Sequence, residues 1–264
     1  MLQACTVLYK TLPAFDAAAL KAALHRLVGP CTFELSVLSP AGAPGVPVTG
    51  GLAEFGDHRV ALIALPYPVR KEILEVTVDV SPMPDAARRD FAGHGAAVRV
   101  LYVGSDPDPI EQLIALYHVA QLLLDIGGIR IINERAALAQ PAEMIYTLAQ
   151  HLGEDVPPIQ LWTGAITFVL GENEEIPRYI LRVFGMDQCG LPEVAIYIKS
   201  RSQADDAYHV LMNVCLYFVQ SRLNFSLSVG DRVEFGGHTY LLTDPGVDSS
   251  EFASQTGILL LVDV

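Results

Sequence analysis

The sequence predicts an α+β fold with mainly antiparallel, mixed sheets flanked by amphipathic helices. Half of its 264 residues are apolar (51%), which is enough to bury a large core. Short runs rich in β-branched and aromatic residues are interspersed with apolar stripes at helical spacing. Because these two kinds of segment follow one another in mixed order, they favour α+β over a regular alternation of strand and helix.

The overall charge limits the classes of partner. The formal net charge is −13. Nucleic acid and anionic membrane surfaces reward clustered Lys and Arg, so we expect neither as a partner. Such acidity suits solubility or association with a basic protein partner.

The cysteines and the amino terminus indicate a cytoplasmic protein. The four cysteines (Cys5, Cys31, Cys189 and Cys215) are widely spaced and form no CxxC pair. This spacing argues against a zinc ribbon and a disulfide framework, and it predicts free thiols in a reducing compartment. The first residues lack the basic start and apolar run of a signal peptide. The most apolar later stretch, 113–126, is shorter than the ~20 residues that cross a bilayer.

Turn residues divide the chain into successive elements. Pro157-Pro158 marks the expected boundary between an N-terminal portion, 1–155, and a C-terminal portion, 159–264, although the two could form one continuous domain. In the first portion we expect strands at 5–11, 32–38, 52–55, 59–65, 96–103 and 129–132, and helices at 16–28, 85–92, 108–126 and 141–152. In the second portion we expect strands at 160–170, 179–184, 194–199 and 257–264, with two short strands near 224–240.

The segment 39–51 is rich in Pro and Gly and is predicted to be a loop. It is either a mobile flap or a long connection within a hairpin. The closing segment, 257–264, is too apolar to be an edge strand.

The surest helix lies at 203–219. Its apolar residues recur at three- and four-residue steps, which predicts that Leu211 and Phe218 are almost fully buried. Ser202 and Asp205 resemble a capping box at its start. Asn213 borders the stripe and is either a hydrogen-bonded core residue or a ligand contact.

The connection 185–193 reads GMDQCGLPE. Two glycines bracket this short turn between two strands. We therefore predict a positive φ at Gly185 or Gly190, the conformation that glycine adopts without steric cost.

Several of these segments resemble a bacterial family catalogued as domain of unknown function 4261. The resemblance rests on Gly185, Met186, Gly190 to Glu193, Asn213, Tyr217, Gly230 and Asp231, together with Pro66-Tyr67-Pro68 and the segment around His94. It implies a similar fold and no particular activity. Residues 69–80 fit both a strand and a helix by periodicity, and the resemblance favours the helix.

His94 and Glu193 are the most site-like residues. Glycines flank His94 at a helix-to-strand junction, where it is either reachable for chemistry or bonded to a helix-end carbonyl. Glu193 is either a proton acceptor or the cross-strand partner of Arg178 or Arg182.

Other polar residues are partner or ligand candidates. They are Asn213, Asp231 and the run Glu172, Glu174 and Glu175, which joins Asp205 and Asp206 in a predicted acidic face. The remaining histidines lack metal-ligand spacing, so no metal and no cofactor are expected. The motifs GxSxG, GxGxxG and GxxxxGK[ST] are absent.

The leading hypothesis is a non-catalytic bacterial protein that binds or regulates another macromolecule, such as an immunity or accessory protein that neutralises a basic effector. The first alternative is an enzyme of unrecognised type that uses His94 and Glu193 as acid and base. The second is a scaffold that acts by forming a homo-oligomer.

Overall fold

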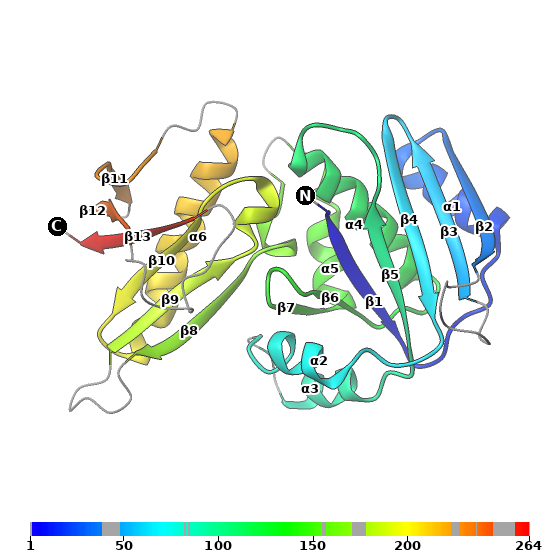
Figure 1. The fold of residues 1–264 in the computed structure, drawn as a ribbon, viewed down its shortest axis with the longest axis horizontal. Coiled ribbons are helices and arrows are strands. Elements are labelled where there is room, and N and C mark those ends of the chain that lie inside the picture. The colour runs from blue at the N-terminus through cyan, green and yellow to red at the C-terminus, as the bar shows by residue number, and fades with distance from the viewer. Residues whose placement is uncertain are drawn as a thin grey trace. The chain divides into compact units, whose positions relative to one another are not determined.

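The computed structural model describes residues 2–38, 48–81, 83, 85–154, 157–170, 178–222, 227–235, 237–244 and 257–263 (Figure 1). The chain divides into two units, Met1–Leu161 and Trp162–Val264. Each unit contains one mostly antiparallel sheet with helices packed against it, which confirms the predicted α+β class. The division falls just after Pro157-Pro158.

The first unit is built on a seven-stranded antiparallel sheet with the order β2-β3-β4-β5-β1-β6-β7. Its strands are β1 (Ala4–Tyr9), β2 (Cys31–Leu38), β3 (Val48–Phe55), β4 (His58–Leu65), β5 (Ala96–Tyr102), β6 (Arg130–Asn133) and β7 (Leu138–Pro141). Its helices are α1 (Ala17–Val28), α2 (Lys71–Thr77), α3 (Asp85–Ala92), α4 (Pro109–Asp125) and α5 (Ala142–Ala149).

Helix α4 covers the middle of this sheet, where it contacts β1, β4 and β5. The carboxylate of Asp108 accepts a hydrogen bond from the Ile110 backbone N–H at 2.9 Å, and Pro109 occupies the first turn. The Tyr9 hydroxyl donates to the Leu123 carbonyl oxygen at 2.8 Å and fixes the helix to β1. The start and end of α4 agree with the helix predicted at 108–126.

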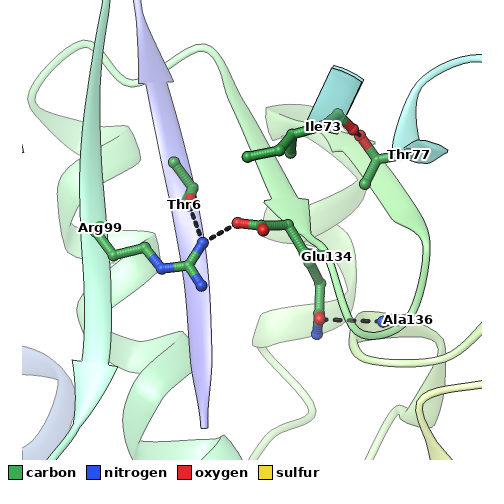
Figure 2. A network of polar contacts seen from close by, with 7 residues as sticks. Thr6, Ile73, Thr77, Arg99, Glu134 and Ala136 are labelled. Atoms are coloured by element: carbon green, nitrogen blue, oxygen red, sulfur yellow. Dashed lines mark hydrogen bonds and ion pairs between the residues drawn. The ribbon is translucent and has the colours of Figure 1, made fainter. Parts of the chain in front are cut away.

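The opposite face of the sheet carries α2 and α3 at one end. Leu8 and Ala97 pack there with Val78 and Phe91. Residues 69–80 therefore contain a helix, as predicted, although it ends at Thr77. The Thr77 hydroxyl donates to the Ile73 carbonyl oxygen at 2.7 Å (Figure 2).

A half-buried ion pair lies on the same face. Arg99 of β5 points between Thr6 of β1 and Glu134 of the β6–β7 turn (Figure 2). Its Nη1 donates to the Thr6 hydroxyl oxygen at 3.0 Å and pairs with the Glu134 carboxylate. These contacts join strands β1 and β5 to the β6–β7 turn and give the half-buried Arg99 charge its partners.

The sequence prediction was wrong at two places in this unit. Residues 48–51, predicted as loop, begin β3 and pair with β2 and β4. A Cβ on Gly51 would lie 3.3 Å from the side chains of Leu35 and Leu62, so close packing of the sheet uses the glycine there. Strand β7 was not predicted because its four residues form only by pairing with β6. Residues 39–47, which carry the flap prediction, lie outside the described residues.

The second unit contains a six-stranded sheet with the order β11-β12-β13-β10-β9-β8. Its elements are β8 (Gly164–Leu170), β9 (Arg178–Phe184), β10 (Glu193–Ile198), α6 (Ala204–Gln220), β11 (Arg232–Phe235), β12 (His238–Thr243) and β13 (Ile258–Asp263). Strand β13 lies inside the sheet, between β12 and β10, as its apolar sequence predicts. It runs parallel to β10, and the other pairs are antiparallel.

Strand β8 begins later than predicted. Residues Ile159–Leu161 form a short 3-10 helix, and the strand starts at Gly164. The carbonyl oxygen of Trp162 accepts from the Gln188 side-chain amide at 3.0 Å. Tertiary hydrogen bonding therefore overrides the apolar run that suggested a longer strand.

Helix α6 packs on one face of the second sheet, against β9 and β10. Leu211 and Phe218 are fully buried, which confirms the predicted core stripe. The predicted cap at Ser202 is wrong, since the helix begins after Gln203 and its first residue follows a 3-10 turn, Arg201–Gln203. The Ser202 hydroxyl instead bonds with that of Ser200 at 2.7 Å.

Candidate functional site

The turn between β9 and β10 has the backbone that its glycines predicted. Gly185 (φ 99°) and Gly190 (φ 70°) are both left-handed, and the residues between them, Met186–Cys189, form a 3-10 helix. These residues are buried. The left-handed positions reverse the chain within a short distance and bring Glu193 back beside β9.

Replacing Gly190 with alanine should lower the free energy of unfolding by about 1–2 kcal/mol, the cost of a left-handed L-residue. A Cβ at this position meets no atom within 4 Å, so backbone strain alone would produce the loss. Gly153→Ala is the matched control, because its Cβ also meets nothing and its φ is not positive. Urea unfolding of both variants tests this; equal stability of the two would refute the strain argument.

Glu193 is the buried partner of Arg182. Their side chains are 4% exposed each, and Glu193 Oε2 accepts from Arg182 Nε at 2.9 Å and from Nη2 at 2.5 Å. Glu193 Oε1 accepts from the Gly185 backbone N–H at 3.3 Å. The Arg182 guanidinium also stacks 4.2 Å above the Phe184 ring. Burial raises the pKa of Glu193, and the adjacent guanidinium opposes that rise.

His94 lies in the first unit and is buried. Its Nδ1 bonds to the Phe91 carbonyl oxygen at 2.6 Å, and its Nε2 accepts from the Val69 backbone N–H at 2.8 Å. Accepting an N–H requires an unprotonated Nε2, so the ring is the neutral tautomer that donates through Nδ1. This arrangement ties the end of α3 to the segment before α2. Both ring nitrogens are occupied by backbone groups, which favours the structural interpretation of this residue.

The remaining predicted residues are dispersed. Asn213 is exposed on α6, so it needs no buried hydrogen-bond partner. Asp231 accepts from the Ser228 backbone N–H at 2.7 Å and shapes the turn before β11. Asp205 and Asp206 are exposed at the start of α6, whereas Glu172, Glu174 and Glu175 lie outside the described residues.

A polar hollow of about 390 Å³ lies at the β3–β4 turn of the first unit. His58 lines it, and its Nδ1 lies 3.2 Å from the Tyr102 hydroxyl oxygen. Burial raises the pKa of Tyr102, so the hydroxyl is neutral at physiological pH. Behind it, burial and the nearby His58 lower the pKa of His118. Asp57 and the ion pair of Arg59 with Glu54 (2.9 Å between Nε and Oε1) also line the hollow.

A groove of about 410 Å³ lies on the second unit between the first half of α6 and the ends of β10 and β13; we call it the α6 groove. Its floor consists of buried side chains, namely Ile196, Ile198, Ala207, Tyr240 and Leu261. Its rim consists of exposed residues, namely Lys199, Asp206, His238 and Asp263. An apolar floor with a polar rim is typical of binding surfaces.

No sequence motif identified the α6 groove. Its residues come from three strands and a helix that are far apart in the chain, and only the parallel pairing of β10 with β13 brings them together.

Metal and thiol chemistry find no support in the described part of the chain. Within it, no group of three His, Cys, Asp or Glu side chains could hold a metal ion. Cys5, Cys189 and Cys215 are buried and form no disulfide, and burial raises the pKa of Cys5 to about 12. A thiol with so high a pKa is a poor nucleophile at neutral pH.

Comparison of the chain with protein-family models, curated proteins and solved structures finds no match. The resemblance to domain of unknown function 4261 therefore stays a prediction. Among the described helices, none combines the length and apolar character needed to cross a bilayer.

Proposed function

We propose that this chain is a non-catalytic binding protein that regulates a protein partner in the bacterial cytoplasm, and that the partner docks at the α6 groove. The observation that carries the proposal is the groove itself, with its buried apolar floor and exposed rim.

The two candidate catalytic residues support binding over catalysis. Glu193 is held by Arg182 and Gly185, and His94 is held by two backbone groups. A general acid or base must reach a substrate proton with a free lone pair or hydrogen. Glu193 and His94 already use their lone pairs and hydrogens in hydrogen bonds within their own units.

A photo-crosslinking amino acid at position 238 tests the proposal. In lysate of the native host, the His238 variant should capture one protein partner, and the yield should fall when Asp206 is changed to Arg. His209 is the matched control, because it is an exposed histidine of α6 that does not line the groove. Equal capture at both positions, or yields that ignore the Asp206 change, would contradict docking at the groove.

A further inference from the structure

We infer that the α6 groove accepts an arginine side chain from a basic segment of the partner. This inference rests on the proposed function and specifies its chemistry. Its basis is the combination of an aliphatic floor, a tyrosine and two carboxylates within one groove.

The floor suits the stem of a long side chain. Ile196, Ile198 and Leu261 are nearly fully buried and present aliphatic surface to the groove. Arginine and lysine both bury their methylene stems on such surface while the charged head stays near water. A purely polar ligand would leave this surface unused.

The rim suits a cationic head. Asp206 of α6 and Asp263 of β13 are exposed carboxylates, and among the described residues Lys199 is the one lysine or arginine that lines the groove. His238 Nδ1 lies 3.8 Å from Asp263 Oδ2, which is a loose contact. The carboxylates therefore outnumber the fixed cations at the rim, and they would repel phosphate or carboxylate ligands.

The floor tyrosine favours arginine over lysine. Tyr240 is the cross-strand partner of Asp263, so a guanidinium bound to that carboxylate would lie beside the Tyr240 ring. A guanidinium stacks on aromatic faces and bonds to a carboxylate through two parallel N–H groups. An ammonium is a point charge without this planar geometry. The chain's net charge of −13 would also attract a basic segment.

A random peptide library displayed against the full chain tests this chemistry. The peptides that bind should share an arginine flanked by apolar residues. Replacing that arginine with citrulline, which has nearly the same shape but no charge, should weaken binding at least tenfold. The double variant Asp206→Asn/Asp263→Asn should weaken it about tenfold as well.

The control is Asp205→Asn/Asp244→Asn, which removes the same charge from exposed carboxylates that do not line the groove. The affinity of this control variant for the selected peptides should stay within about twofold of that of the unmodified protein. Equal losses in both double variants would overturn the inference, because they would indicate long-range charge alone. Selected peptides without arginine would also overturn it. Capture by the crosslinker at position 238 decides separately whether the docking proposal survives.

Discussion

Replacing Arg182 with methionine should lower the free energy of unfolding by about 3–5 kcal/mol at neutral pH. The change leaves the Glu193 carboxylate buried without the guanidinium that now donates to it at 2.9 Å and 2.5 Å. Glu193→Met should cost a similar amount, because it removes the carboxylate that accepts two hydrogen bonds from the buried Arg182 guanidinium. Urea unfolding followed by circular dichroism measures both losses.

The double variant Arg182→Met/Glu193→Met should recover most of this loss. Both charges are then absent, and apolar side chains fill a site bordered by Ile180, Ala195 and Leu260. Buried ion pairs are often no more stabilising than apolar residues of similar volume. If the double variant lost as much unfolding free energy as the two single variants together, this account would be contradicted.

The single variants should differ in their pH dependence. Burial already raises the pKa of Glu193, and loss of Arg182 removes a group that opposes the rise. A folded-state pKa above the unfolded value of about 4.3 gives stability that is present at acidic pH and lost as the pH rises. The deficit of Arg182→Met should therefore shrink between about pH 8 and about pH 5. The loss of unfolding free energy in Glu193→Met should not shrink over this pH range, since Arg182 stays protonated throughout.

The sequence predicted best where local rules and tertiary packing agree. Asp108 and Pro109 start α4 and Gly185 and Gly190 shape their turn, because capping and left-handed backbone depend on near neighbours. The sequence predicted least where contacts between different segments of the chain determine the local structure. Strand β7 exists only through pairing with β6, and Ser202 lost its capping role to the 3-10 turn.

The candidate site shows the same limit. The partnership of Glu193 with Arg182 was among the predicted alternatives, because antiparallel neighbours face each other at a short sequence distance. The α6 groove was not predicted. Asp206 and Asp263 lie on elements that only the completed sheet brings together, and neither carries a recognisable motif.

Phe218→Ala and Leu211→Ala should each lower the free energy of unfolding by about 2–5 kcal/mol. Both side chains are fully buried on the inner face of α6, so truncation removes apolar contacts and leaves a cavity between the helix and the sheet. Asn213→Ala is the control on the same helix, because Asn213 is exposed and alanine is the better helix former. It should be neutral or stabilise by a few tenths of a kcal/mol. Losses below about 1 kcal/mol in both core variants would mean that α6 is held mainly by its ends, and the groove between α6 and β13 would then rest on a loosely attached helix.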